Sequence, residues 1–147
     1  KMIEPSPEMK SIFSETKIMV HNEDYFIVSI SRNEEENARV LLKDLKPWSS
    51  ITFDPEEVSV VLKDHDWSDV KGSFRDFKEE GPYRLLTFDI VLDLNLVGFL
   101  SVVSALLAHE DISIYAVSTY LRDHILVKKE DADKAVVALE QLINIDK

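Results

Sequence analysis

The chain has 147 residues, of which 45% are hydrophobic and 31% charged, a composition typical of folded globular proteins. Its 28 acidic residues outnumber 17 basic ones and both halves are acidic, which argues against nucleic acid as a partner. The absence of cysteine excludes disulfides and thiol chemistry. The apolar stretch Leu94–Ala108 is shorter than the ~20 residues of a membrane span, and no secretory signal is visible, so a cytoplasmic protein is expected.

The first residues carry little periodic pattern. Residues 1–16 include two prolines near their start, which predicts an N-terminal arm or leading turn. Lys17–Val20 is a candidate short strand, and Tyr25–Ile30 is aromatic and β-branched, which predicts a second strand. Apolar residues at helical spacing predict a helix over Asn33–Leu45.

Three further elements complete the first half of the chain. Ser31 and Glu34 have the spacing of a capping box at the start of the predicted helix. Ser50–Phe53 and Glu57–Lys63 are predicted to be strands joined by a turn, and Asp66–Phe77 is predicted to be helical. The first half therefore has the order strand, helix, strand, strand, helix.

The second half repeats this order after Gly81-Pro82, which marks a boundary. A strand, a helix, two strands and a helix are expected in turn over Tyr83–Leu92, Leu96–His109, Ile112–Ser118, His124–Lys128 and Asp131–Ile143. Each run lacks a final strand, which Lys17–Val20 or the tail Ile143–Ile145 is expected to supply. Half-buried antiparallel hairpins require helices on one face of the sheet, so the pattern predicts an α+β protein.

The second half resembles the ACT domain, a ferredoxin-like βαββαβ module that binds amino acids as a regulatory signal. The resemblance is carried by LNLVGF at Leu94–Phe99, by ISIYAVSTYLRDHILV at Ile112–Val127 and by EDADKAVVAL at Glu130–Leu139. These segments are similar to the ACT domains of aspartate kinase and of the cytosolic arginine sensors of eukaryotic growth control. The first half is similar only in layout.

The resemblance implies two ACT-type units side by side, with antiparallel sheets and helices on one face. The implied division is an arm over residues 1–16, a first unit over 17–80 and a second unit over 81–147. It also implies a homodimer with an amino acid effector at an ACT–ACT interface. The implied effector contacts lie in the loop before the helix and in the hairpin: Asp93, Leu94, Asn95, Leu96, Val97, Gly98, Phe99, Thr119, Tyr120 and Asp123.

The residue chemistry of the loop is compatible with that site but leaves alternatives open. Gly98 is predicted in the first helical turn, where glycine costs about 0.5–1 kcal/mol relative to alanine. Close approach of a ligand or tight packing of the helix would each explain it. Asp93 and Asn95 could recognise a ligand or serve as turn and N-cap residues.

The hairpin residues also have two interpretations. Asp123 could bind the ammonium of a ligand or a basic side chain, or be a solvated turn carboxylate. Tyr120 could close the pocket as an aromatic lid or pack across the strands. Arg122 could pair with Asp123 or with an acidic ligand, but is expected to point to water. The acidic helix start of the first half, Ser31–Glu36, lacks an equivalent glycine, which argues against a second site there.

No pattern in the sequence supports catalysis or a metal. His21, His65, His109 and His124 are scattered, without HxxxH spacing, so no metal ligands and no cofactor are predicted. Asp64-His65-Asp66 could bind a divalent ion, but a polar loop is favoured. Because no GxSxG, P-loop or GxGxxG motif occurs, the protein is not expected to be an enzyme.

The predicted helix Leu96–His109 is apolar nearly all round, so its second apolar face is expected to pack on another ACT unit or a second chain. The sequence therefore favours a non-catalytic, amino-acid-binding regulatory protein. The alternative is a protein–protein interaction module of the same fold, whose effector pocket is closed by Leu94, Leu96 and Phe99.

Overall fold

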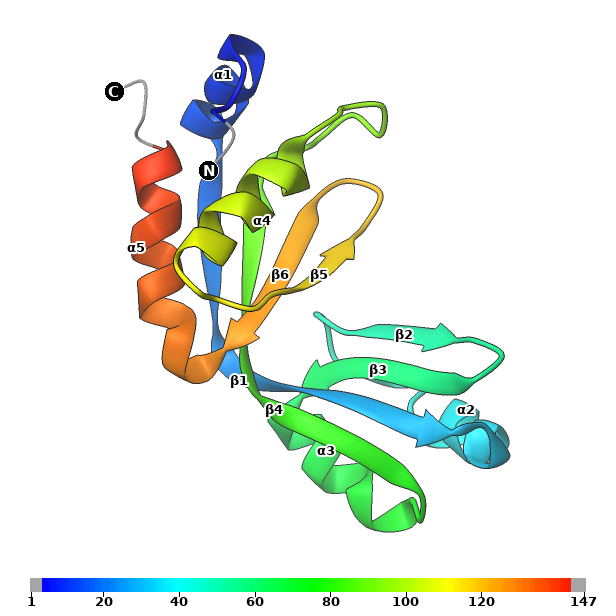
Figure 1. The fold of residues 1–147 in the computed structure, drawn as a ribbon. Helices are drawn as coiled ribbons and strands as arrows, with labels where there is room; N and C mark the ends of the chain where they lie inside the picture. Colours follow the sequence, from blue (N-terminus) through cyan, green and yellow to red (C-terminus); the bar gives the residue numbers. More distant parts are fainter. Residues whose placement is uncertain (1–3, 144–147) are drawn as a thin grey trace. The chain divides into compact units, whose positions relative to one another are not determined.

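The computed structural model describes residues 4–143. After a first helix, the order strand, helix, strand, strand, helix occurs twice along the chain, with a short 3-10 turn beside α2, α3 and α5. Their bounds are α1 Pro7–Glu15, β1 Lys17–Ser31, α2 Glu35–Leu41, β2 Ser50–Phe53, β3 Glu57–Lys63, α3 Asp64–Val70, β4 Phe77–Asp89, α4 Phe99–His109, β5 Tyr115–Ser118, β6 Asp123–Lys128 and α5 Ala132–Ile143 (Figure 1).

The chain divides into two compact units. The first unit of the structure comprises residues 1–22 and 84–147, and so contains most of the segment 81–147 that the sequence predicts as the second ACT-type unit. The second unit of the structure comprises residues 23–83. The long strands β1 and β4 each contribute residues to both units. The candidate strand Lys17–Val20 is the beginning of β1 and belongs to the first unit, where it lies next to β4 in the sheet. The other candidate, Ile143–Ile145, lies largely outside the described residues.

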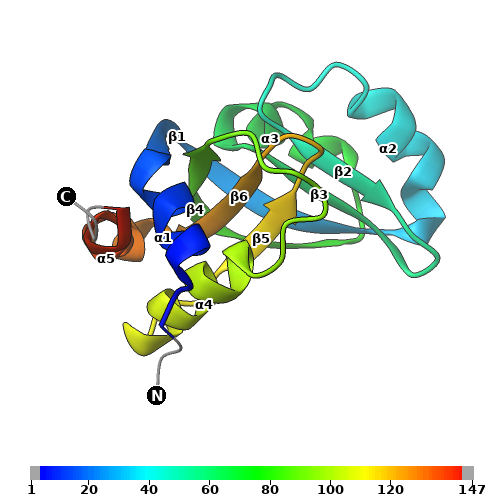
Figure 2. The same cartoon turned by 90° about the horizontal axis from the view of Figure 1, so that it is seen from above.

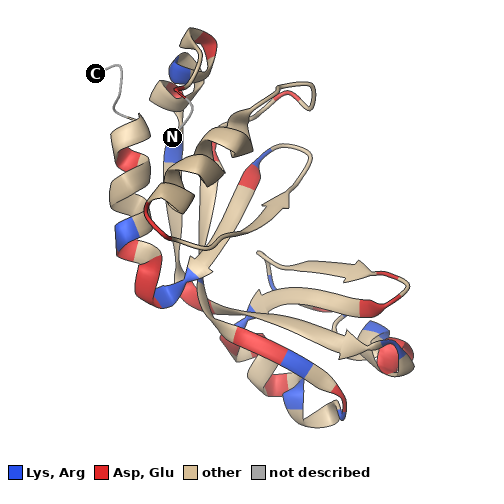
Figure 3. Cartoon of the chain, viewed as in Figure 1, with Lys and Arg blue, Asp and Glu red and all other residues tan. Residues whose placement is uncertain are grey.

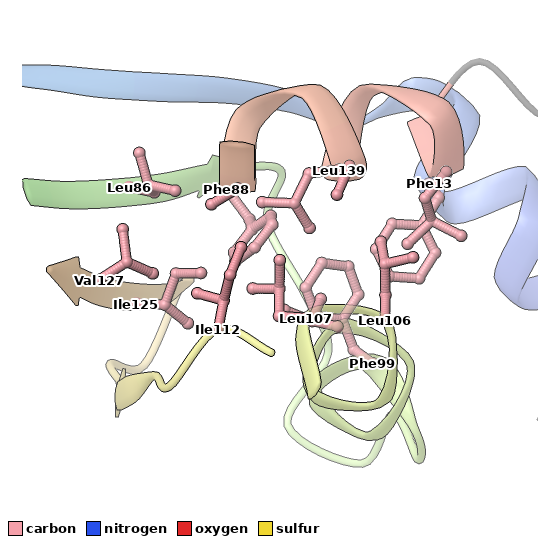
Figure 4. Packing of buried hydrophobic residues seen from close by; sticks show 14 of the residues in the cluster. Phe13, Leu86, Phe88, Phe99, Leu106, Leu107, Ile112, Ile125, Val127 and Leu139 are labelled. Atoms are coloured by element: carbon pink, nitrogen blue, oxygen red, sulfur yellow. The ribbon is translucent and has the colours of Figure 1, made fainter. Parts of the chain in front are cut away.

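The first unit has the strand order β1-β4-β6-β5, with α1, α4 and α5 against it (Figures 1 and 2). The β5–β6 hairpin is antiparallel, with Tyr115 opposite Leu126 and Ser118 opposite Asp123. Apolar side chains from β4, β6 and the helices fill the space between sheet and helices (Figure 4). The arrangement confirms the predicted α+β, ferredoxin-like architecture.

The second unit has the strand order β2-β3-β1-β4, and β3 pairs antiparallel with both of its neighbours. Its core includes Trp67 of α3, whose ring contacts Phe77 edge to face at 5.1 Å. The predicted helix over Asp66–Phe77 is wrong in its second part, because Phe77 begins β4 and reaches Trp67 from the sheet. Asp64 and the residues after it begin α3, so the favoured polar loop is also wrong.

The expected N-terminal arm contains a helix. Ser6 caps α1 by accepting a hydrogen bond from the Met9 amide at 3.1 Å, and Pro7 occupies its first position. Phe13 is fully buried, and its ring stacks on Phe99 of α4 with centroids 4.5 Å apart (Figure 4). The second apolar face of α4 is therefore covered by the chain's own α1, which removes the reason for requiring a second chain there.

The capping box expected at the start of α2 forms only in part. The Ser31 hydroxyl accepts a hydrogen bond from the Asn33 amide at 3.2 Å. The Glu34 carboxylate instead accepts the amides of Arg75 and Asp76, at 3.1 and 2.8 Å. Glu34 thus fastens the segment before β4 to the start of α2, a long-range contact that the capping-box spacing does not predict.

Candidate effector site in the first unit

A cavity of about 310 Å³ lies between the segment that leads into α4 and the β5–β6 hairpin. Its volume is within the range of small-molecule sites, which start near 300 Å³. Both walls belong to the first unit. The lining residues are Leu92, Asp93, Leu94, Leu96, Gly98, Phe99, Leu100, Ser101, Ser118, Thr119, Tyr120, Leu121, Arg122 and Asp123.

The wall before α4 is a series of turns. The Asp93 carboxylate accepts the Asn95 amide at 2.8 Å, and the Asp93 carbonyl accepts the Leu96 amide at 3.0 Å. The Leu92 amide donates to the Leu121 carbonyl at 3.0 Å and ties this wall to the hairpin. These contacts use the polar groups of Asp93 locally, as the turn interpretation predicts.

Gly98 is the N-cap of α4 and has a left-handed backbone, with φ of 101°. The helix therefore begins at Phe99 and not at Leu96, because a residue with this φ cannot continue a right-handed helix. Gly98 has no side chain to cap the helix. The first amides of α4 consequently carry partial positive charge beside the cavity, where they suit an anionic group.

The hairpin wall carries charges of both signs, seen as adjacent blue and red segments where β6 begins (Figure 3). Arg122 lines the cavity, and its Nε donates to the Asp89 carboxylate at 3.0 Å. The expectation that Arg122 points to water is therefore wrong. Asp123 begins β6 opposite Ser118 and also lines the cavity. The wall thus offers a cation and a carboxylate within one turn.

The structure brings most of the predicted contact residues to one cavity. The ones that line it are Asp93, Leu94, Leu96, Gly98, Phe99, Thr119, Tyr120 and Asp123. Asn95 and Val97 do not line it, and Val97 is 86% exposed. Phe99 is only 4% exposed, because its ring packs against Phe13 and Phe88 in the core.

Other lining residues were not predicted as contacts: Leu92, Leu100, Ser101, Ser118, Leu121 and Arg122. All of them adjoin the predicted loop or hairpin in sequence, so widening each segment by a few residues would have included them. The option that Arg122 pairs with an acidic ligand is the signal in the sequence for its place in this wall.

A second cavity, in the second unit, is mainly polar. It is lined by Ser31, Asn33, Glu34, Asn37, Ser73, Arg75 and Asp76. Its Glu34 carboxylate already accepts two backbone amides, and the Asn37 side-chain Nδ2 donates to the Ser73 carbonyl at 2.9 Å. These groups are therefore engaged in holding the segment before β4.

Among the described residues, one group of histidine and aspartate side chains has metal-ligand spacing: His65, Asp66 and Asp69 on the short helix α3. His65 and Asp69 are exposed and pair with each other, with Nδ1 and Oδ2 3.3 Å apart. These three residues lie in the second unit and are not among the residues that line the cavity of the first.

Among residues 4–143, every helix is too short or too polar to span a membrane.

The part of the chain that holds the cavity is similar to a known family. Residues 79–141, which include both cavity walls, match the family model of the ACT domain. No curated protein sequence matches the chain significantly.

Solved structures share the fold over nearly the whole chain. A protein of unknown function from Vibrio cholerae superposes with a TM-score of 0.71 at 20% identity, covering 92% of this chain and 96% of that one. A protein from Agrobacterium tumefaciens gives 0.70 at 24% identity, covering 87% and 89%. The regulatory subunit of aspartate kinase from Thermus thermophilus gives 0.63 at 11% identity, covering 86% and 97%.

Proposed function

We propose that this protein is a non-catalytic regulatory protein of tandem ACT type that binds an amino acid in the cavity of the first unit. The observation that carries the proposal is the meeting of the α4 N-terminus, Arg122 and Asp123 around one cavity. The match of residues 79–141 to the ACT domain and the similarity to an aspartate kinase regulatory subunit support a regulatory role.

The charges around the cavity suit the two ends of a zwitterion. The ligand carboxylate would accept hydrogen bonds from the first amides of α4 and from the guanidinium of Arg122. Asp123 would accept hydrogen bonds from the ligand ammonium. Asp93 contributes negative charge nearby, although one of its oxygens already accepts the Asn95 amide.

The remaining lining favours a ligand with an uncharged side chain. Leucines come from both walls, and Tyr120 stands at the hairpin with 76% of its surface exposed, in a position to cover a bound molecule. A charged side chain placed against such walls would lose hydration without gaining a partner. Neutral amino acids with apolar side chains are therefore expected to bind best.

Exposed apolar side chains around the cavity support a second chain as the cover of the site. Val91, Leu94, Val97, Tyr120 and Leu121 all lie on the two walls or beside them and are 48–86% exposed. Such a patch is typical of an interaction surface. We propose a homodimer with the effector at an ACT–ACT interface. Sedimentation that shows only monomer, with and without ligand, would contradict it.

The alternative function is a ligand-free interaction module of the same fold, and the same exposed apolar patch is the observation that favours it. In that case Leu94, Leu96 and Phe99 should close the pocket. In the structure these three residues line an open cavity, and the Phe99 ring is directed into the core. The geometry therefore favours ligand binding.

Thermal unfolding of the full chain against each of the twenty amino acids at millimolar concentration tests the proposed function. A ligand at 100 times its dissociation constant stabilises the protein by about 2.7 kcal/mol, which raises the melting temperature by several degrees. One or two neutral amino acids are expected to give this shift. A flat panel, obtained with the dimer present, would instead support the interaction module.

A further inference from the structure

A row of hydrogen-bonded side chains crosses three strands of the first unit and ends at the hairpin wall of the cavity. His21 Nε2 lies 2.8 Å from Thr87 Oγ1, and Thr87 Oγ1 lies 2.9 Å from His124 Nδ1. The other ring nitrogen of His124, Nε2, lies 3.2 Å from Thr119 Oγ1. Thr87 and His124 are each only 5% exposed. A largely buried polar chain thus connects β1 to the hairpin.

Which group donates in each of these hydrogen bonds follows from the bonding of Thr119, at the hairpin end of the row. The Thr119 hydroxyl donates to the Arg122 carbonyl at 2.9 Å, because a carbonyl oxygen can only accept. Thr119 Oγ1 is then free to accept from His124 Nε2–H. A neutral His124 therefore has an unprotonated Nδ1, which accepts from the Thr87 hydroxyl. Thr87 Oγ1 in turn accepts from His21 Nε2–H.

The same contacts fix the shape of the hairpin. Both the amide and the hydroxyl of Thr119 donate to the Arg122 carbonyl, each at 2.9 Å. These bonds close the turn that presents Tyr120, Leu121 and Arg122 to the cavity. His124 supports the turn from the sheet side by donating to Thr119.

A second proton on His124 would disturb this arrangement. The proton would enter at Nδ1, where the Thr87 hydroxyl now points its own hydrogen. Nε2–H would still donate to Thr119, but Thr87 would lose its acceptor and would have to reorient in a buried setting, so the ring that supports the turn would lose the contact that orients it. The pKa of His124 is lowered, chiefly by burial and next by the neighbouring charge of His21. Asp123 raises this pKa, and Arg122 lowers it. Arg84 of β4 also approaches the chain, since its Nη1 donates to the His21 carbonyl at 3.1 Å.

We propose that His124 is a positioning residue for the cavity: its neutral form, oriented by Thr87, holds the Thr119–Arg122 turn in the ligand-binding shape, and proton uptake by His124 loosens that turn and releases the ligand. This inference rests on the proposed function. It makes the strength of effector binding depend on pH through a group that does not line the cavity.

The sign of the pH effect follows from the lowered pKa of His124 in the folded chain. The unfolded chain takes up this proton first, near the ordinary histidine value of about 6.5. The contribution of His124 to stability is therefore complete above about pH 6.5 and is lost as the pH falls through the folded pKa. Ligand affinity should fall in the same direction.

Nuclear magnetic resonance of the 15N-labelled full chain tests the chain of hydrogen bonds without a ligand. At about pH 7.5, His124 is expected as the Nε2–H tautomer. As the pH is lowered, the amide signals of Thr119 and Arg122 should shift with the same midpoint as the His124 ring. Thr87→Val should change that midpoint and Thr87→Ser should restore it. His109→Gln, at an exposed position of the same unit, should leave it unchanged.

Amino acid binding gives the second readout. The full chain is titrated with each of the twenty amino acids at about pH 7.5 and at about one pH unit below the His124 midpoint measured by magnetic resonance. The apparent affinity of any that bind should fall about fivefold or more at the lower pH, and Thr87→Val should reduce that dependence while Thr87→Ser keeps it.

Three results would overturn the inference: an Nδ1–H tautomer, hairpin amides that stay still while His124 titrates, or an affinity independent of pH. If no amino acid binds at either pH, the proposed function fails. The hairpin amides then decide the role of His124 by themselves. Thus the two proposals can fail separately.

Discussion

Phe13→Ala is expected to cost the first unit about 3–5 kcal/mol, the usual range for deleting a buried phenylalanine ring. Phe13 is fully buried and stacks on Phe99, whose ring meets Phe88 edge to face at 5.3 Å. Removing the Phe13 ring would leave a cavity between α1 and α4. Because a domain has a total stability of about 5–15 kcal/mol, much of the first unit's stability would be lost.

The loss should be measured by hydrogen exchange of the α4 amides. Both tryptophans of the chain, Trp48 and Trp67, lie in the second unit, so tryptophan fluorescence would report on the wrong part. Val137→Ala is the matched control, because Val137 is a 58% exposed helical residue of the same unit. If Phe13→Ala changes the exchange no more than the control does, α1 is not part of the core.

Gly98→Val is expected to abolish stabilisation by the amino acid ligand. With φ of 101°, Gly98 has a backbone conformation that costs a side-chain-bearing residue about 1–3 kcal/mol. Space is not the obstacle, since an added Cβ would meet only the Met9 Cε, at 3.8 Å. The strained backbone should therefore relax, and the first amides of α4 would then move away from their places beside the cavity.

The measurement is the ligand-induced rise in melting temperature, compared between variant and parent. Gly72→Val is the control, because a Cβ at Gly72 meets no heavy atom within 4 Å and its backbone is outside the left-handed region. The control should keep the full ligand-induced shift. A Gly98→Val protein that is stabilised as much as its parent would show that the α4 N-terminus takes no part in binding.

The sequence is informative where a local pattern decides the structure. The hairpin between Ser118 and Asp123 was predicted from strand composition, and the fold of the second half came from its resemblance to the ACT domain. A glycine in the first turn of a predicted helix marks Gly98 as unusual, but its role as N-cap depends on a positive φ that no periodicity shows.

Long-range contacts explain what the sequence did not predict. The capping signals of α1, Ser6 and Pro7, were present, but the helix gains its stability from Phe13 packing on Phe99, over eighty residues away. Lys17–Val20 and Tyr25–Ile30 were predicted as separate strands because polar residues intervene, yet they form the single strand β1. Arg122 lines the cavity because Asp89, the last residue of β4, holds its guanidinium.

The division into two ACT-type units over residues 17–80 and 81–147 stays a proposal, as do the contact residues themselves. The exposed apolar residues at the mouth of the cavity are also the basis for the proposed homodimer.

The most direct test of the central claim is a map of amide shifts in the 15N-labelled chain on titration with the amino acids that raise its melting temperature. The account predicts saturable shifts concentrated in residues 92–101 and 118–123, the two walls of the cavity. Shifts concentrated instead around Ser31–Asn37 and Ser73–Asp76, or no saturable shift with any amino acid, would contradict it.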